Sequence, residues 1–433
     1  MKRTLYNELK KWKTRLDRKP LLLQGARQVG KTWLMQEFGK NEYKNFVYVN
    51  FDKDKRVSSY FDIDISPKHI ITSLENKYST KITPRETLII FDEVQESSRA
   101  LNSLKYFYED MPQYHVIAAG SFLGVTMHGG FPVGKVDRLT LYPLSFYEFL
   151  DAIGKKRYLK ALINLDFDLA RSLSLDYNDL LKIYFYIGGM PKVVASYAQQ
   201  TVLDEVRIIQ DEILEDYKDD FSKHINFANI AKVNMIWESI AIHLSKEKKK
   251  FMYKDLKEGA RAYAFEDAMN WLFSTRLVYK VSRTIFPKLP LVNFQEREAF
   301  KLYVLDIGLL SAKAKVDIKT LLEPNYEIFS DFNGAMTEQF VLQELKSVGE
   351  TPFYWGREKG AAEIDFILQW QNEVVPIEVK SGIRKKSKSL DFYMTQYRPM
   401  HAIRTSLNNY GIVNNLYSIP LYMISSFKEI LKM

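Results

Sequence analysis

The sequence predicts a multidomain α/β protein whose first domain contains a doubly wound parallel sheet. Three observations support this fold class. An apolar strand that begins at residue 21 runs directly into a glycine-rich loop and a helix, a second apolar strand at residues 87–91 ends in two carboxylates, and strand and helix patterns alternate to about residue 150. The 433 residues, 46% of them hydrophobic, are sufficient for about three packed domains.

The glycine-rich loop is a complete G-x-x-x-x-G-K-[ST] motif. Its glycines let the backbone curl so that N–H groups point at phosphate oxygens, and the helix that starts near Gly30 presents the positive end of its dipole. Lys31 is expected to reach the β- and γ-phosphates of ATP, and Thr32 to offer its hydroxyl to Mg²⁺. A turn that merely joins a strand to a helix is the alternative. The predicted ATP-binding residues of this stretch are Gly25, Ala26, Arg27, Gln28, Val29, Gly30, Lys31, Thr32 and Trp33.

Two acidic residues, Asp92 and Glu93, directly follow the apolar strand at residues 87–91. The carboxyl ends of the strands of an open parallel sheet share one crevice, so we expect Asp92 to lie beside Thr32 and to bind the same Mg²⁺ and nucleotide. Glu93 is then placed to polarise the attacking water as the catalytic carboxylate. An acidic helix N-cap is the alternative interpretation of this pair.

The other elements of the first domain follow from shorter patterns. An amphipathic helix is expected over residues 3–15, and buried strands over residues 45–51 and 115–120. Ser121 ends the last of these strands, where its hydroxyl would contact the γ-phosphate or the attacking water. A turn residue is equally compatible with that position.

Five segments together resemble a widespread, mostly uncharacterised bacterial and archaeal family of AAA+-type P-loop ATPases. They are GARQVGKT, LIIFDEVQ, IAAGSFLG, GKVDRLTLYPLSFYEFL and YIGGMPKVV. The resemblance implies an AAA+-like ATPase core with ATP and Mg²⁺ as ligands, and a homo-oligomer in which a neighbouring subunit supplies an arginine. This chain departs from the family at Lys135, where arginine is frequent, and at Ser121, where AAA+ proteins usually have asparagine. Arg27 and Arg138 are the remaining arginine candidates.

Residues 151–222 are expected to form a helical lid, because apolar residues recur at helical spacing from about residue 145. Gly188, Gly189 and Pro191 interrupt this pattern. They would form either a hinge or nucleotide-facing turn, or only the end of a helix.

Residues 223–325 resemble a winged helix. Helices are expected near residues 228–244 and 265–273, and two strands of a wing near residues 277–281 and 300–304. A basic run between the helices would either contact nucleic-acid phosphates or remain a solvated loop. It consists of Lys246, Lys248, Lys249 and Lys250.

The last part, residues 326–433, contains a second candidate site. Two apolar strands flank a Gln-Asn turn within residues 361–382 and carry Asp365, Glu378 and Lys380. Glu378 and Lys380 are two residues apart and so point to one face, where a hairpin brings Asp365 alongside. This is the D…ExK arrangement of restriction-endonuclease-like, or PD-(D/E)xK, folds, in which the carboxylates hold Mg²⁺ and the lysine steadies a phosphate or hydroxide. Glu338 would add a further metal ligand. Cross-strand ion pairs are the alternative.

Composition bounds the partners and the compartment. The net charge of +9 favours polyanionic partners or serves solubility. The chain has no cysteine, which excludes disulfides and thiolate zinc sites. Residues 1–13 carry charges throughout and have no apolar signal-peptide core, and no stretch of about eighteen uninterrupted apolar residues occurs. We therefore expect a soluble cytoplasmic protein without a membrane partner.

The complete prediction is a P-loop ATPase core at residues 1–150, then the lid, the winged helix and a nuclease-like domain. Such a protein would bind and hydrolyse ATP and act on nucleic acid, with the C-terminal site cutting it in a Mg²⁺-dependent reaction. The rival hypothesis is a nucleotide-switched DNA- or protein-binding module whose nuclease-like domain does not cut.

Overall fold

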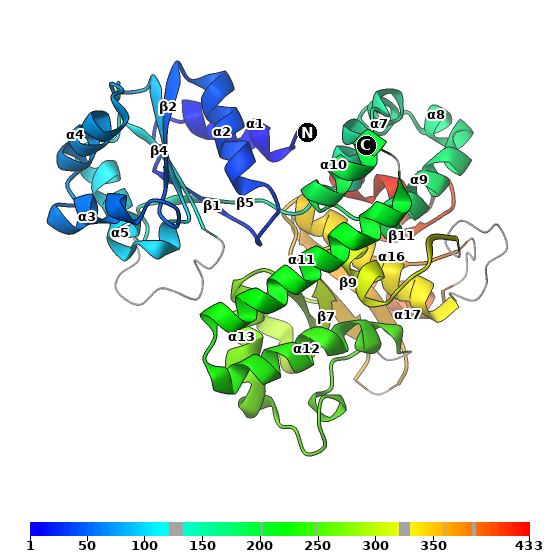
Figure 1. Cartoon of the computed structure of the whole chain (residues 1–433). Coiled ribbons are helices and arrows are strands. Elements are labelled where there is room, and N and C mark those ends of the chain that lie inside the picture. Colours follow the sequence, from blue (N-terminus) through cyan, green and yellow to red (C-terminus); the bar gives the residue numbers. More distant parts are fainter. Residues whose placement is uncertain (121–132, 201, 247–248, 320–329, 359, 383–386) are drawn as a thin grey trace. The chain divides into compact units, whose positions relative to one another are not determined.

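The computed structural model describes residues 1–433 except 121–132, 201, 247–248, 320–329, 359 and 383–386 (Figure 1). The described residues group into two compact units. The N-terminal unit comprises Lys2–Tyr142 and Ser274–Arg276. The C-terminal unit comprises Pro143–Phe273 and Leu277–Met433, together with Met1. Each unit is described separately below.

A five-stranded parallel sheet forms the centre of the N-terminal unit, with the strand order β2-β3-β4-β1-β5. Because successive strands are parallel, each connection crosses the sheet, which confirms the predicted doubly wound core. Strand β1, which precedes the phosphate loop, lies inside the sheet, between β4 and β5. The strands are β1 (Leu21–Gln24), β2 (Asn45–Asn50), β3 (Thr87–Asp92), β4 (His115–Ala119) and β5 (Asp137–Thr140).

Helices cover both faces of this sheet: α1 and α2 lie on one face, and α3, α4 and α5 on the other (Figure 1). The expected amphipathic helix is α1, whose Leu9 and Trp12 are buried. The helices are α1 (Leu5–Thr14), α2 (Lys31–Glu42), α3 (Lys55–Ile63), α4 (Pro67–Tyr78) and α5 (Ser98–Asp110), with the short 3₁₀ turn η1 (Val94–Glu96).

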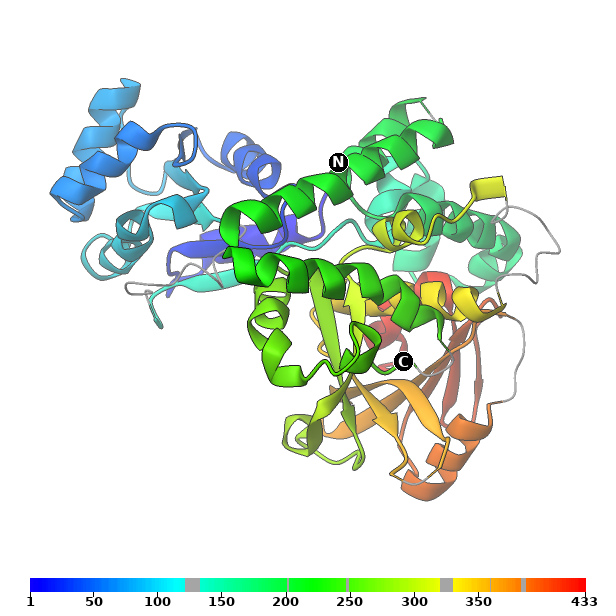
Figure 2. The same cartoon turned by 60° about the horizontal axis from the view of Figure 1, so that its bottom comes forward.

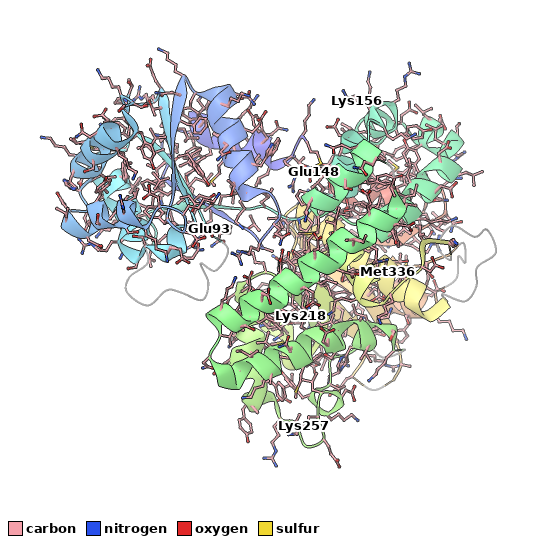
Figure 3. The ribbon with its side chains drawn as sticks, in the orientation of Figure 1. Glu93, Glu148, Lys156, Lys218, Lys257 and Met336 are labelled. Carbon is pink, nitrogen blue, oxygen red and sulfur yellow. The ribbon has the colours of Figure 1, made fainter. Side chains whose placement is uncertain are left out.

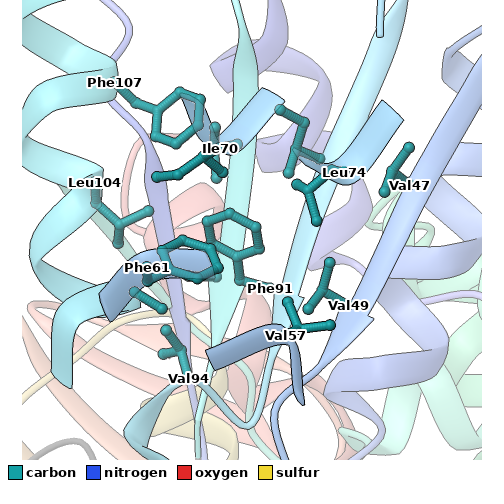
Figure 4. Close-up of a cluster of buried hydrophobic side chains, with 14 of the residues drawn as sticks. Val47, Val49, Val57, Phe61, Ile70, Leu74, Phe91, Val94, Leu104 and Phe107 are labelled. Atoms are coloured by element: carbon teal, nitrogen blue, oxygen red, sulfur yellow. The ribbon is translucent and has the colours of Figure 1, made fainter. Parts of the chain in front are cut away.

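The apolar core on the α3, α4 and α5 side sets which residues the strands present to each face (Figure 4). Val47 and Val49 of β2 and Phe91 of β3 point into this core. The rings of Phe61 and Phe91 meet edge to face, with their centroids 5.5 Å apart. Since strand residues alternate between faces, the residues between these apolar positions are directed to the opposite side of the sheet.

Helices occupy the region that was predicted to be a lid. Gly188 ends α9 in a left-handed conformation (φ 73°), and a Cβ there would collide with Asp306 and Gly308. A Cβ at Gly189 would likewise collide with the backbone of Leu144. This close backbone packing within the C-terminal unit supports the helix-end interpretation of the glycine pair. The helices are α6 (Phe146–Ala152), α7 (Lys156–Ile163), α8 (Phe167–Ser172), α9 (Ser174–Ile187), α10 (Pro191–Gln200) and α11 (Leu203–His224).

The segments predicted as a winged helix and as a nuclease-like domain share one sheet. Its order is β12-β13-β11-β10-β9-β8-β6-β7, so that the predicted wing strand β6 lies beside β8 and β7 lies at the edge (Figure 2). The junction is a parallel pairing in which Arg283 of β6 lies opposite Tyr354 of β8. The strands are β6 (Val278–Thr284), β7 (Gln295–Val304), β8 (Phe353–Gly356), β9 (Glu363–Trp370), β10 (Glu373–Val379), β11 (Ala402–Ser406), β12 (Gly411–Val413) and β13 (Leu416–Pro420).

The helices of the second half pack on this sheet. One apolar core joins α17 to the strands through Trp355, Ile364 and Tyr393. The helices are α12 (Phe227–Ser245), α13 (Glu266–Ser274), α14 (Ile307–Lys313), α16 (Ser330–Ser347), α17 (Lys388–Tyr397) and α18 (Phe427–Ile430). Short 3₁₀ turns are η2 (Tyr253–Asp255), η3 (Ala262–Phe265), η4 (Leu291–Phe294) and η6 (Leu421–Ser426).

This organisation differs from the predicted division into four domains. Helices α12 and α13 have nearly the expected bounds, and the antiparallel strands β6 and β7 extend beyond theirs. By their contacts, residues 143–273 and 277–433 form one unit. The physical reason is the β6–β8 pairing, which makes the expected wing part of a continuous sheet. In the described part of the chain, no helix has both the length and the apolar character needed to cross a bilayer.

Candidate functional site

The phosphate loop connects β1 to α2 within the N-terminal unit. Gly25 has φ 156°, and a Cβ at this position would collide with the carbonyl oxygen of Leu141, at the end of β5. Gly30, with φ 93°, precedes the first residue of α2 in a left-handed conformation. Both positions require glycine for conformational or steric reasons. The loop backbone thus adopts its shape by means of the two glycines of the motif.

The first turn of α2 is suited to an anion. Gly30 stands at the N-cap position and has no side chain that could accept a hydrogen bond from the helix N–H groups. The first turn also contains no acidic side chain. The N–H groups of this turn and the positive end of the helix dipole thus make a favourable environment for phosphate oxygens.

Lys31 lies inside the loop rather than in solvent. Its residue is only 7% exposed, and its ammonium donates to the carbonyl oxygens of Gly25 at 2.9 Å and Ala26 at 2.7 Å. Burial lowers the pKa of Lys31 to about 8, although Glu93 and Asp92 oppose the shift. A buried ammonium with a lowered pKa beside loop carbonyls gains charge stabilisation when a phosphate approaches it.

Asp92 accepts hydrogen bonds from three uncharged donors. Its Oδ2 accepts from the hydroxyls of Thr32 and Tyr48, each at 2.7 Å, and its Oδ1 accepts from the backbone N–H of Glu93 at 3.1 Å. The Asp92 residue is 2% exposed. Thr32 donates its proton to Asp92, so its oxygen lone pairs remain available to a cation. The structure thus brings together the two predicted Mg²⁺ ligands of this site.

Glu93 lies directly after β3, at the carboxyl edge of the sheet (Figure 3). It has a left-handed backbone, with φ 52° and ψ 42°, which is uncommon for a residue with a side chain. Its half-buried carboxylate accepts a hydrogen bond from the amide of Gln95 at 2.6 Å. The unusual backbone turns the side chain out of the strand direction while Gln95 fixes its orientation.

The positively charged candidates around the loop have different surroundings. Lys135 forms an ion pair with Glu109 at 2.9 Å, and Arg138 is exposed on β5. Arg276 was not singled out from the sequence, yet it belongs to the N-terminal unit and donates to the side chain of Gln24 at 2.7 Å. Its charge contributes to the lowered pKa of Lys31. No local pattern marks such a residue, because it comes from a distant turn of the chain.

Trp33 and Ser121 are two further residues that were predicted to contact the nucleotide. Trp33 is 44% exposed on the first turn of α2. Ser121 lies outside the described residues.

The second candidate site lies in the C-terminal unit, on the antiparallel β9–β10 pair. The backbone N–H of Val379 donates to Asp365 Oδ2 at 2.9 Å. Glu378 Oε1 accepts from Lys380 at 2.6 Å and from Ser387 at 2.7 Å. Glu378 is 4% exposed, and its Oε2 is buried with no hydrogen-bond partner among the described residues. The hairpin therefore places Glu378 and Lys380 side by side, as expected from their spacing.

Glu338 of α16 is surrounded by donors from other segments. The ammonium of Lys249 is paired with Glu338 Oε1, Lys301 lies 3.6 Å from Oε2, and the Tyr303 hydroxyl donates to Oε2 at 3.1 Å. Lys301 is also paired with Glu363 at 2.7 Å. Burial alone would raise the pKa of Glu338, but Lys301 and Lys249 outweigh it and lower the value to about 2. Glu338 is therefore an ionised carboxylate neutralised from within the protein.

Asp365 has the opposite electrostatic environment. Burial and the neighbouring carboxylates of Glu338 and Glu378 raise its pKa well above the ordinary value, although Lys301 and Lys249 act against this. The protonated form of Asp365 is favoured beside an ionised Glu338. One proton and two lysines thus compensate the negative charge of this cluster.

The metal site of Glu338, Asp365 and Glu378 stays a prediction, and the contacts of Glu338 bear on it. In the described ranges of the chain, no group of three or more His, Cys, Asp or Glu side chains is placed to hold a metal ion. The two oxygens of Glu338 contact Lys249, Lys301 and Tyr303, and these donors would compete with a metal ion for this carboxylate. The sequence indicated the carboxylates but not the lysines that neutralise them.

Two lysines of the basic run Lys246, Lys248, Lys249 and Lys250 have acidic partners. Lys246 is paired with Asp255 at 2.7 Å, and Lys249 is paired with Glu338. Lys248 lies outside the described residues. The choice between phosphate contact and a solvated loop therefore stays open for this run.

Comparison with known families divides the chain into three matched segments. Residues 17–150 match a family described as AAA domain, residues 178–320 match a domain of unknown function (DUF8612), and residues 333–424 match another domain of unknown function (DUF4143). The first match supports an AAA-type P-loop ATPase domain in the N-terminal unit. The match at residues 333–424 carries no nuclease description.

No curated protein matches the chain in sequence. Among solved structures, the Walker-type ATPase PABY2304 of Pyrococcus abyssi is 14% identical with a TM-score of 0.45, over 71% of this chain and 94% of that chain. The RuvB Holliday junction branch migration motor of Thermotoga maritima is 14% identical with a TM-score of 0.31, over 63% and 88%. AMPPCP-bound DnaA of Aquifex aeolicus is 16% identical with a TM-score of 0.30, over 63% and 86%. The AAA assignment of residues 17–150 therefore comes from the family match and not from these loose likenesses.

Proposed function

We propose that the chain binds ATP with Mg²⁺ in the N-terminal unit and hydrolyses it. The observation that carries this proposal is the contact between Thr32 and Asp92, 2.7 Å apart, next to the uncapped first turn of α2. A hydroxyl and a carboxylate are the oxygen ligands that Mg²⁺ prefers. An open helix N-terminus one residue away is the environment that phosphate prefers.

Each residue of the site has a role that follows from its contacts. Lys31 exchanges the carbonyls of Gly25 and Ala26 for phosphate oxygens, which bind its charge more strongly. Thr32 and Asp92 would hold the metal, which supplies positive charge to the phosphates when it is bound. Glu93 orients the attacking water and takes up its proton.

The test is ATP binding and turnover by the full chain in the presence of Mg²⁺. Lys31→Ala removes the buried counter-charge and is expected to weaken ATP binding by about 100-fold or more. Lys257→Ala, at an exposed position on a loop of the other unit, is the matched control and leaves binding unchanged (Figure 3). Equal ATP affinity of a folded Lys31→Ala variant and the parent protein would refute the proposal.

The catalytic assembly is part of the same proposal. Lys135 occupies the position at which the family often has arginine, and it is paired with Glu109. We therefore expect weak basal ATP turnover, and a homo-oligomer as the active form. Fast turnover by a strictly monomeric protein in analytical ultracentrifugation would contradict this expectation.

A second candidate function concerns the C-terminal unit: we propose that it binds nucleic acid or a protein partner without cutting it. The observation that favours this over a Mg²⁺-dependent nuclease is the pairing of Glu338 with Lys249 and Lys301. Two internal ammonium groups compete with a metal ion for the same carboxylate oxygens. The excess of 62 Lys and Arg over 53 Asp and Glu residues supports a polyanionic partner.

Incubation with single- and double-stranded DNA and RNA, in the presence of ATP and Mg²⁺ or Mn²⁺, tests this second proposal. We expect retained complexes that weaken with salt, and no cleavage above that of an Asp365→Ala variant. Cleavage by the parent protein that disappears in Asp365→Ala would establish the nuclease instead. A complete lack of binding to all four nucleic acids would favour the protein-binding form of the module.

A further inference from the structure

Tyr48 contacts the predicted metal-binding carboxylate but belongs to no recognised motif. It lies on β2, and its hydroxyl donates to Asp92 Oδ2 at 2.7 Å, on the same oxygen that Thr32 contacts. Tyr48 OH in turn accepts a hydrogen bond from the side-chain amide of Asn50 at 3.1 Å. A continuous chain of hydrogen bonds thus runs from Asn50 through Tyr48 to Asp92 and Thr32.

The strand register explains why these side chains meet. Tyr48 pairs with Ile90 and Asn50 pairs with Asp92 in the parallel β2–β3 ladder. Val47, Val49 and their neighbours on β3 face the apolar core, so alternation directs Tyr48, Asn50 and Asp92 to the opposite face. Neighbouring parallel strands then hold the three polar side chains side by side.

Asn50 connects this series of hydrogen bonds to the turn that follows β2. Its side-chain oxygen accepts from the backbone N–H of Asp52 at 3.1 Å and of Lys53 at 2.9 Å. The amide therefore fixes the turn with one end and the Tyr48 hydroxyl with the other. The link to Tyr48 is one hydrogen bond and the link to the turn is two, and all three end on the Asn50 side chain.

The chemistry of the phenol suits a positioning role. Burial and the contact with Asp92 raise the pKa of Tyr48 to about 12, so that it remains a neutral donor at all ordinary pH values. A neutral donor fixes the direction of a carboxylate without cancelling its charge, whereas an ammonium would compete with the metal ion.

We propose that Tyr48 positions the Asp92 carboxylate for the Mg²⁺ of bound MgATP, and that Asn50 connects this metal site to the turn at residues 51–53. The inference rests on the proposed binding of MgATP at Thr32 and Asp92. Tyr48 is a positioning residue, since it acts through Asp92 and not on the nucleotide.

The first experiment compares ATP affinity and metal requirement in the full chain. Tyr48→Phe removes only the hydroxyl. We expect the ATP dissociation constant in EDTA to stay within about twofold, and the Mg²⁺ concentration for half-maximal turnover to rise about tenfold, which corresponds to the loss of one hydrogen bond to a charged group. Tyr78→Phe is the matched control, because Tyr78 packs against the apolar core of the same unit.

The outcomes separate this inference from the function on which it rests. If the parent protein binds no ATP, both are refuted. If it binds ATP and Tyr48→Phe has the Mg²⁺ requirement of the parent, only the inference is refuted. A loss of ATP affinity in EDTA equal to the loss with Mg²⁺ would also refute it, because that result indicates general damage to the site.

Hydrogen exchange tests the connection to the turn. Addition of Mg²⁺ to the ATP complex is expected to slow hydrogen exchange of the Asp52 and Lys53 backbone amides in the parent protein. The reason is that a fixed Asp92 and Tyr48 hold the Asn50 side chain, whose oxygen accepts from these two amides. In Tyr48→Phe and Asn50→Ala this slowing should be absent. Equal slowing in the parent and in both variants would refute the connection.

Discussion

Two buried carboxylates, Asp92 in the N-terminal unit and Glu338 in the C-terminal unit, were both predicted to bind a metal ion, but their partners differ in charge. Asp92 accepts from two hydroxyls and a backbone N–H, all neutral. Glu338 accepts from one hydroxyl and is paired with two lysines. Neutral donors orient a carboxylate and leave its charge in place, whereas ammonium groups cancel that charge.

A buried carboxylate at the end of a strand or within a helix therefore serves different ends according to the charge of its donors. A metal ion at Asp92 would meet a carboxylate whose hydrogen-bond donors are neutral, although the nearby Lys31 ammonium interacts with its charge. A metal ion at Glu338 would first have to displace Lys249 or Lys301, and a displaced buried ammonium is costly. The N-terminal site is therefore poised for a cation and the C-terminal site is already neutralised.

The largest expected effect concerns the chemistry of the N-terminal site. Glu93→Gln should lower ATP turnover by about 10²- to 10⁴-fold, because an amide cannot take up the proton of the attacking water. ATP affinity should be retained, since the amide has nearly the same shape. Turnover in saturating ATP measures this change, and Glu96→Gln, at an exposed position of the neighbouring turn, is the matched control. Wild-type turnover of Glu93→Gln would remove Glu93 from catalysis.

The second prediction tests the neutralised site. Lys301 is 1% exposed, and Lys301→Met would leave Glu338 and Glu363 with a missing counter-charge. We expect the free energy of unfolding of the C-terminal unit to fall by about 3 to 5 kcal/mol, measured by urea denaturation. A Lys301→Met and Glu338→Gln double variant should recover part of this loss. Lys31→Met is the comparison in the N-terminal unit, and an equal loss there would erase the contrast between the two sites.

The smallest expected effect is a pH dependence at Lys31. Its pKa of about 8 in the nucleotide-free protein means that the side chain is protonated at pH 7 and largely neutral at pH 9. Bound phosphates raise this pKa, so ATP binding must take up a proton at pH 9 but not at pH 7. The ATP affinity, measured without metal, should be about tenfold lower at pH 9 than at pH 7.

Lys31→Arg is the control for this profile, because a guanidinium stays charged over the whole range. Its ATP affinity should be nearly constant between pH 7 and pH 9. If the ATP affinity of the parent protein is equally constant between pH 7 and pH 9, Lys31 does not titrate in this window. The contrast between Lys31 and Lys301 would then lose its electrostatic basis.

The sequence by itself determined the parallel sheet of the N-terminal unit and most of its site. The loop from Gly25 to Thr32 is contiguous, so its glycines and the start of α2 form the proposed phosphate site through local backbone geometry. Asp92 could be placed beside Thr32 because strand ends of a parallel sheet share one edge. Tyr48 could have been found by the same logic, since strand alternation puts it on the face of Asn50.

Only the tertiary structure decided the character of the C-terminal site and the extent of its sheet. Lys249 and Lys301 reach Glu338 from positions 89 and 37 residues away in the chain. The parallel pairing of β6 with β8 likewise joins segments that a local pattern describes as separate. Hydrophobic periodicity specifies which face of a strand is buried. It does not specify which neighbouring strand pairs with it, or which distant ammonium neutralises a buried carboxylate, because both depend on long-range packing.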